Sequence, residues 1–279
     1  MPNVPGRWLR EPSIWRKISL NTWKEPDNAT IYGVLDIEAG PLMTWLQKRT
    51  EESGIKVTMT HAVSRALAIL MRKHPSTNVL VRGRKIWLRD KVDIFHQVAM
   101  PVPGNPGKTD LSGVTVRNVD TLRVEGIAQV LRAQAEKVRK KEDGEMARTR
   151  NTMFMLPEFL LKTVLAIIGW LTYDLNLVLP TVPRDPFGGA MVTAVGMFGI
   201  KTAFAPIVTF SKAPIVLLIG EIEDRVVARE GQVVIRKMCT ITAAMDHRVL
   251  DGFVGGLLAS GMQKILENPE LLDADPSEV

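Results

Sequence analysis

The sequence predicts one α/β domain in which strands of mixed direction and helices share a core. Apolar residues alternate with polar ones, or run uninterrupted, in the last third of the chain, which is typical of strands. Earlier segments carry apolar stripes at helical spacing, bounded by glycine and proline. No internal repeat or linker divides the 279 residues, and a composition of 46% hydrophobic and 24% charged residues excludes wholesale disorder, a coiled coil and a collagen-like chain.

The first half of the chain should alternate strands with helices. One helix begins at Pro41, and Thr60 is the candidate N-cap of the next. Two short strands on either side of residues 89–91 could pair as a hairpin, and the proline- and glycine-rich stretch 101–113 is predicted to be a loop. The expected strands are 29–37, 85–88, 92–100 and 114–116, and the expected helices are 41–53, 58–73 and 122–141.

An unusually apolar stretch opens the second half. Its eleven uncharged residues, 163–173, would rise about 16 Å as a helix, roughly half the thickness of a bilayer core. The stretch is therefore too short to span a membrane, but it could be buried in an oligomer or lie at a membrane interface, which Trp170 favours. Strands are expected at 190–195, 215–221, 226–229 and 232–245, with turns at Asp224 and Glu230-Gly231, before a last helix at 253–266.

Charge and cysteine content exclude several classes of protein. The net charge of +6 and a pI near 9.5 favour anionic partners such as coenzymes or acidic lipids. Nucleic acid is not expected, because the sequence carries no zinc-finger or RNA-binding signature. Cys239 is the single cysteine, so an internal disulfide and a multi-cysteine metal site are excluded, and no metal is expected. The first residues show no signal-peptide pattern, which favours a cytoplasmic location.

Of the four histidines, His247 occupies the position most typical of a catalytic group. It follows a long apolar strand and precedes the Asp251-Gly252 turn that begins a helix, where a scaffold can hold a side chain rigidly. A neutral imidazole there could act as a general base, and Asp251 could hold the loop through an ion pair. The spacing alone is equally compatible with a capped turn that has no catalytic role.

The segment Asp246–Gly252 resembles the signature of the acyltransferase component of 2-oxo acid dehydrogenase complexes, and chloramphenicol acetyltransferase has a similar motif. Further segments resemble that family in the same order along the chain: 73–78, 91–94, 116–120, 196–200 and 267–270. We therefore identify residues 14–272 as resembling the catalytic domain of the dihydrolipoamide acyltransferase component. The resemblance implies a chloramphenicol acetyltransferase-like α/β fold, with a mixed sheet flanked by helices, that forms trimers.

The resemblance also implies a site between subunits, which coenzyme A and a dihydrolipoyl arm enter from opposite sides. Coenzyme A would be a substrate, and His247 would take the proton of the attacking thiol. Thr193 stands where the family has a serine whose hydroxyl, supplied by the neighbouring subunit, donates to the oxyanion. Threonine keeps that hydroxyl, although its β-branch restricts the side chain. Asp251, Gly252 and Arg16, which matches an arginine of the family pattern, would support the histidine loop.

Three departures from the family shape the remaining expectations. The chain shows no lipoyl domain, so we expect no covalent lipoyl group on it and either a lipoyl-bearing protein in trans or another acceptor. Residues 151–186 form a longer, more apolar connection than the family's, an insertion that could make an acyl pocket, an oligomer surface or a peripheral membrane contact through 153–180. Residues 1–13 would be a loose lead-in and 273–279 a flexible acidic tail, which favours an isolated homotrimer over a larger cage.

Three functions are compatible with these features. The leading hypothesis is a stand-alone cytoplasmic acyltransferase that moves an acyl group between coenzyme A and a thiol through His247 and Thr193. A non-catalytic trimeric scaffold of the same fold is suggested by the threonine and by the missing lipoyl domain. A membrane-associated acyltransferase that uses the apolar insertion is the third.

Overall fold

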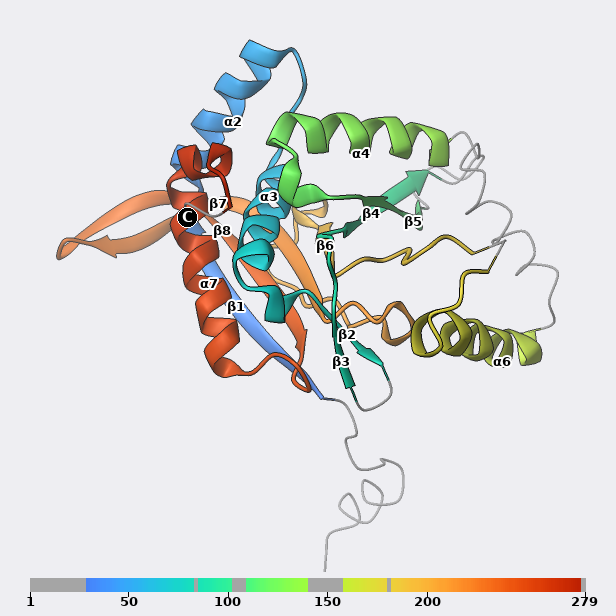
Figure 1. Ribbon diagram of the computed structural model, residues 1–279. Helices are drawn as coiled ribbons and strands as arrows, with labels where there is room; N and C mark the ends of the chain where they lie inside the picture. Colours follow the sequence, from blue (N-terminus) through green and yellow to red (C-terminus); the bar gives the residue numbers. More distant parts are fainter. Residues whose placement is uncertain (1–28, 83–84, 102–108, 140–157, 180–181, 277–279) are drawn as a thin grey trace, which may run out of the picture.

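The computed structural model of the protein describes residues 29–82, 85–101, 109–139, 158–179 and 182–276. Its centre is a six-stranded sheet in the order β1-β8-β7-β6-β4-β5 (Figure 1). The strands of this sheet are β1 (Thr30–Glu38), β4 (Ile94–Pro101), β5 (Thr109–Val116), β6 (Ala190–Ala194), β7 (Ile215–Arg229) and β8 (Gln232–Asp246). β6 runs parallel to both of its neighbours and the other pairs are antiparallel, which confirms the predicted mixed sheet.

One core joins this sheet to the helices that cover it. These helices are α2 (Ala39–Ser53), α3 (Met59–Lys73), α4 (Val124–Arg139) and α7 (Gly252–Glu267). α3 lies deepest, because every residue from His61 to Met71 is buried and the helix contacts both α4 and α7. The backbone N–H of Thr58 donates to the His61 ring Nδ1 at 3.0 Å, so Thr58 caps α3 and the prediction of Thr60 was wrong. A residue can cap a helix only from outside its first turn.

The β7–β8 pair forms a long ribbon that extends beyond the rest of the sheet (Figure 1). The predicted turn at Asp224 is wrong, because Asp224 lies inside β7 and pairs with Lys237. The predicted turn at Glu230-Gly231 is confirmed, and both residues have positive φ, 49° and 77°. The two predicted segments form one continuous strand, which carries a small bulge between Ile219 and Ile222.

Two strand pairings also differ from the prediction. β3 (Lys85–Leu88) pairs with β2 (Val79–Arg82) in a separate two-stranded sheet, so the expected hairpin about residues 89–91 was wrong. The side-chain amide of Asn78, just before β2, donates to the Lys91 carbonyl at 2.9 Å and so holds the segment after β3 beside the start of β2. Residues 109–113, expected as part of a loop, belong to β5, because their backbone pairs with β4. Pairing with the preceding strand, β4, overrides the turn propensity of glycine and proline there.

The apolar stretch contains helix α6 (Glu158–Gly169), followed by a π-helical turn over Trp170–Asp174. Among the described residues, no helix is both long enough and apolar enough to cross a membrane. At the other end of the chain, Asp273 pairs with Arg49 at 2.5 Å, and Arg65 donates to the carbonyl of Ala274. The first residues of the predicted acidic tail are therefore bound to the domain, while Arg16, residues 1–13 and residues 277–279 lie outside the described residues.

Candidate active site

The loop after β8 holds His247 at the surface through backbone contacts. The His247 N–H donates to the Ala29 carbonyl at 2.7 Å, and the Asp246 N–H donates to Pro214 at 2.9 Å. Leu250, three residues after the histidine, is completely buried and anchors the loop in the core. The imidazole itself is exposed. A buried leucine and two backbone hydrogen bonds therefore fix the backbone of His247, while its side chain faces solvent.

The hydrogen bond of the His247 ring determines its tautomer. Nδ1 lies 2.9 Å from the carbonyl oxygen of Leu250. A carbonyl oxygen can only accept, so Nδ1 carries the hydrogen in this contact. In the neutral ring, Nε2 is then left with its lone pair free, and it can accept a proton from a substrate.

The two acidic residues of the loop make different kinds of contact, and the proposed partner of Asp251, Arg16, lies outside the described residues. Asp251 Oδ1 accepts from the Val254 N–H at 2.9 Å and caps α7, whose first residue is Gly252. The ion pair of the loop is formed by Asp246, whose carboxylate receives both Nε (2.9 Å) and Nη2 (2.5 Å) of Arg248. Burial acts to raise the pKa of Asp246, but the bonds from Arg248 outweigh it and hold that pKa below its ordinary value. The loop thus carries its own bidentate ion pair.

Thr193 lies in a different part of the sheet. It is half-buried in β6 and pairs with Leu218 of β7, which in turn pairs with Thr242 of β8. His247 comes five residues after Thr242, so strand spacing separates Thr193 from His247 by roughly 15–20 Å within one chain. The neighbouring Val192 belongs to the core under the helices, and strand alternation therefore turns Thr193 to the opposite face. One chain does not bring the two predicted catalytic residues together.

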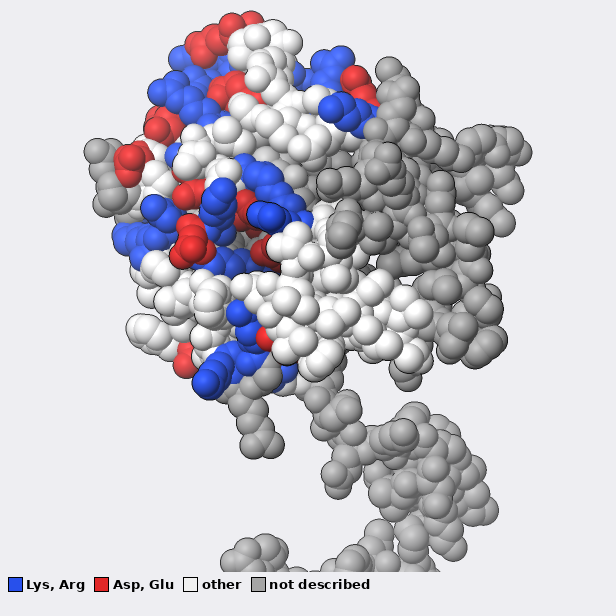
Figure 2. Space-filling model, turned by 45° about the vertical axis from the view of Figure 1, so that its right-hand side comes forward, with Lys and Arg blue, Asp and Glu red and all other residues white. Residues whose placement is uncertain are grey.

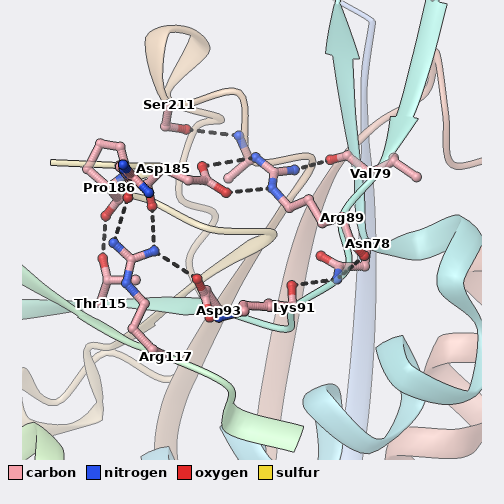
Figure 3. Close-up of polar contacts among 12 residues, drawn as sticks. Asn78, Val79, Arg89, Lys91, Asp93, Thr115, Arg117, Asp185, Pro186 and Ser211 are labelled. Carbon is pink, nitrogen blue, oxygen red and sulfur yellow. Dashed lines mark hydrogen bonds and ion pairs between the residues drawn. The ribbon is translucent and has the colours of Figure 1, made fainter. Parts of the chain in front are cut away.

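A cluster of arginine and aspartate residues fixes the segment that leads into β6 (Figure 3). Arg117 of the β5 end donates to the Asp93 carboxylate at 2.7 Å. The same guanidinium donates to the carbonyls of Arg184 (2.7 Å) and Asp185 (2.8 Å). One side chain therefore ties the strand pair β4–β5 to the end of the apolar stretch.

Arg89 fixes the same segment from the other side. Its guanidinium pairs with the Asp185 carboxylate at 2.9 Å and also donates to the carbonyl of Val79 (Figure 3). The Arg89 side chain is 7% exposed, so Asp185 supplies the counter-charge for a nearly buried cation. Together, Arg89 and Arg117 hold residues 184 and 185 against β2, β4 and β5.

Two glycines let the chain pass close to these groups before β6 begins. A Cβ on Gly188, which has a φ of +63°, would lie 2.2 Å from the carbonyl oxygen of Asp93. A Cβ on Gly189 would lie 2.1 Å from Asn78 Oδ1. Sequence reasoning missed the roles of this cluster, although the Gly188-Gly189 pair and the position of Asp93 in a family-like segment were usable signals.

Both halves of the candidate site are bordered by uncovered apolar side chains. Phe253, next to the histidine loop, is 79% exposed, and Met197, just after β6, is 77% exposed. Phe198, Ile200 and Phe204 continue the second patch. Exposed large apolar side chains that cluster on a surface typically mark a site of interaction with another molecule.

A second uncovered region involves the insertion. Trp87 of β3 lines the same cavity as Leu177 and Val178, and all three are about half exposed or more. Trp170 is also exposed. Figure 2 shows basic and acidic side chains interleaved on one face of the molecule, beside a broad area of uncharged residues. The apolar stretch therefore contributes to the surface as well as to the core.

Comparisons with known proteins identify the family and the fold of this chain. Residues 20–153 and 186–273 match the model of the 2-oxoacid dehydrogenases acyltransferase catalytic domain, and the match passes over residues 154–185. An acetyltransferase component of the pyruvate dehydrogenase complex from Rhizobium meliloti is 40% identical over 88 residues, which are 31% of this chain and 19% of that protein. The lipoamide acyltransferase component of the branched-chain alpha-keto acid dehydrogenase complex from Bacillus subtilis is 26% identical over 79% of this chain and 41% of its own length.

The chain thus spans well under half the length of these curated relatives. Among solved structures, the dihydrolipoamide acetyltransferase of Azotobacter vinelandii has a TM-score of 0.65 at 18% identity, covering 88% of this chain and 84% of that one. In that enzyme, the roles of a serine, a histidine and an asparagine in the catalytic mechanism have been investigated. Because the family model matches most of its residues and the fold agrees, this chain belongs to the acyltransferase catalytic domains of the 2-oxoacid dehydrogenases.

Proposed function

We propose that this protein is a coenzyme A-dependent acyltransferase in which His247 is the general base. The observation that carries the proposal is the 2.9 Å contact between His247 Nδ1 and the Leu250 carbonyl, which leaves Nε2 free to accept a proton. The family supports acyl transfer, and the charge of +6 suits a coenzyme that bears phosphates. Coenzyme A is a substrate in this scheme.

The reaction conserves atoms and electrons without a redox step. The thiol of the acceptor gives its proton to His247 Nε2, and the sulfur attacks the thioester carbonyl carbon to form a tetrahedral oxyanion. The oxyanion collapses, the bond to the departing thiolate breaks, and the imidazolium returns the proton to that sulfur. A thiol has a pKa near 8.5, so most of it is protonated at pH 7 and a positioned base typically contributes about 10²–10⁴-fold.

In this proposal, Thr193 of a neighbouring copy donates its hydroxyl to the oxyanion, and the active assembly is a homotrimer. Two observations support a site shared between copies: the separation of Thr193 from His247 within one chain, and the exposed Phe253 and Met197 beside them. The A. vinelandii enzyme offers a parallel, since its histidine and asparagine lie four positions apart, as do His247 and Asp251.

Asp251 is a positioning residue in this scheme, because it caps α7 directly after the loop. Arg16 is its proposed ionic partner, and Gly252, the first residue of α7, is the second supporting residue. The acceptor is a dihydrolipoyl group carried by another protein in trans, or another thiol. The proposal includes neither a covalent lipoyl group on this chain nor a nucleic-acid partner. It places the activity in the cytoplasm.

The test is thiol release from a panel of acyl-coenzyme A thioesters with dihydrolipoamide as acceptor. We expect His247→Ala to reduce kcat at least about 100-fold. His74→Ala, a histidine at the end of α3, is the matched control and should retain the wild-type rate. Sedimentation should show trimers for all three proteins. Equal turnover by wild type and His247→Ala would contradict the role of the histidine and favour the non-catalytic trimeric scaffold.

A membrane-associated form of the same activity is the second candidate. It is favoured by exposed Trp87, Trp170 and Val178, which offer apolar and aromatic groups suited to a bilayer interface. Flotation with liposomes, lost on deletion of residues 153–180, is the expected result. If the protein binds neither neutral nor anionic vesicles at low salt, the membrane-associated function is contradicted.

A further inference from the structure

A cavity of about 300 Å³ lies between β1 and α7, on the helix side of the sheet. Its walls are almost entirely aliphatic, with Ile31 and Leu35 from β1, Ile241 from β8, and Leu258 and Met262 from α7. Among the described residues that line it, Asp251 alone is charged. An apolar cavity of about 150 Å³ is already enough to bind benzene.

The cavity adjoins the loop that carries the proposed base. Asp251 and Gly252, which end that loop, also form part of the cavity wall. The His247 N–H is bonded to Ala29, immediately before the strand whose residues Ile31 and Gly33 line the same cavity. The loop that carries His247 therefore ends at the wall of this apolar space.

Glycines keep this space open along α7. Gly252 and Gly256 line the cavity, and a Cβ added to either would meet no atom within 4 Å. Neither has the positive φ that would require glycine. Glycine is unfavourable in a helix, and neither position needs it for steric reasons. The two glycines therefore fit a helix face that leaves room for a ligand.

We infer that this cavity binds the hydrocarbon chain of the acyl group that is transferred. Twice the volume that accepts the six carbons of benzene corresponds to a chain of roughly eight to twelve carbons. The aliphatic walls exclude charged acyl groups, and the Asp251 carboxylate at the wall would repel a free acid while tolerating a neutral thioester. The inference rests on the proposed acyltransferase function and names its substrate class as medium-chain acyl thioesters.

The test fills the cavity. Gly256→Leu places four carbon atoms in the open space, and Ala259→Leu, at another lining position, is a second variant in case the first does not fold. Ser260→Leu adds the same side chain to an exposed position of α7 outside the cavity and is the matched control. Two readouts are used: the ratio of kcat/KM for decanoyl- over acetyl-coenzyme A, and the shift in melting temperature caused by 1-decanol, which has no coenzyme moiety.

We expect wild type and Ser260→Leu to prefer decanoyl-coenzyme A and to be stabilised by 1-decanol. Gly256→Leu should lower the preference at least tenfold and lose the stabilisation by 1-decanol. Acetyl transfer with an unchanged ratio in Gly256→Leu would overturn the cavity inference and leave the proposed function intact. Stabilisation by 1-decanol that Gly256→Leu abolishes, with no turnover of any thioester, would support the cavity and overturn the proposed function. The absence of any 1-decanol effect on wild type would overturn the cavity inference.

Discussion

At the end of β8, the side chains of His247, Arg248 and Asp251 find their hydrogen-bond partners two or three residues away. At the start of β6, the partners are remote. Arg117 reaches Asp93, 24 positions away, and Asp185, 68 positions away, while Arg89 and Asp185 are 96 positions apart. The two halves of the candidate site are therefore built by different means, one from its own sequence and one from the packing of the whole domain.

This difference has consequences for how each half tolerates change. The side-chain bonds of the histidine loop need only its own residues, although its backbone also bonds to Ala29 and Pro214. The orientation of Thr193 depends on a cluster that joins three strands to the end of the apolar stretch, so substitutions far from Thr193 can affect it. The insertion lies on that side of the molecule, where its connection to β6 is tied down by charge.

The largest expected effect concerns the hydroxyl of Thr193, in the half of the site built by remote contacts. Thr193→Ala should lower kcat about 10²–10³-fold, because it removes one oxyanion donor without changing the base. Thr193→Ser should equal or exceed wild type, since serine keeps the hydroxyl and frees its rotation. Thr44→Ala, on the exposed side of α2, is the control. Wild-type turnover by Thr193→Ala would show that the hydroxyl is not the donor.

The second prediction compares a buried histidine with the exposed His247. His96 pairs with Val192 of β6, and its Nε2 lies 2.7 Å from Ser64 Oγ. Burial, with a smaller contribution from nearby His61, lowers the pKa of His96 to about 3, and burial lowers the pKa of His61 to about 4. Below pH 6.5 these histidines are protonated in the unfolded chain but stay neutral in the native protein. The free energy of unfolding must therefore fall as pH decreases.

Between pH 7 and pH 5, each of these two histidines should cost about 2 kcal/mol of the free energy of unfolding. The loss should level off below about pH 4 for His61 and below about pH 3 for His96. Urea denaturation across this range measures it. His61→Gln can still accept at the N-terminus of α3 and should remove about half of the decrease. A free energy of unfolding that is the same at pH 7 and pH 5 would contradict the buried neutral state.

The third prediction tests the remote contacts directly. Asp185→Asn leaves the nearly buried Arg89 without its counter-charge and should lower the free energy of unfolding by about 2 kcal/mol, less than a fully buried pair would lose because Asp185 is partly exposed. It should also reduce kcat through Thr193. Glu52→Gln breaks the exposed Lys48–Glu52 pair and should change stability by under about 0.5 kcal/mol. Equal effects of the two variants would remove the structural role given to the cluster.

The smallest effect is expected in the local loop. Asp251→Ala removes the cap of α7 and should cost about 1 kcal/mol of stability, whereas Asp251→Asn retains an acceptor oxygen and should stay within about 0.5 kcal/mol. Thermal or urea unfolding of both variants measures the difference. If Asn is as damaging as Ala, the charge of Asp251 matters beyond the cap, which would favour the proposed pairing with Arg16.

Several features were predictable because their causes are local. The strand β8, the turn at Glu230-Gly231 and the helix α7 follow from apolar patterning and from turn and capping residues that are adjacent in the chain. The motif that contains His247 is likewise contiguous, and it identified the family before any geometry was known. Strand partners were less predictable, as β3 and residues 109–113 show, because pairing joins segments whose sequences do not encode each other's position.

The sequence by itself determined the α/β class, the position of the histidine loop and the apolar character of the insertion, since composition and short-range periodicity govern these properties. Only the tertiary structure decided that Arg89 and Arg117 anchor the segment before β6, and that Thr193 lies far from His247 within one chain. It also decided that a cavity opens between β1 and α7. Each of these depends on how distant segments pack, and short stretches of sequence carry no information on the distances between them.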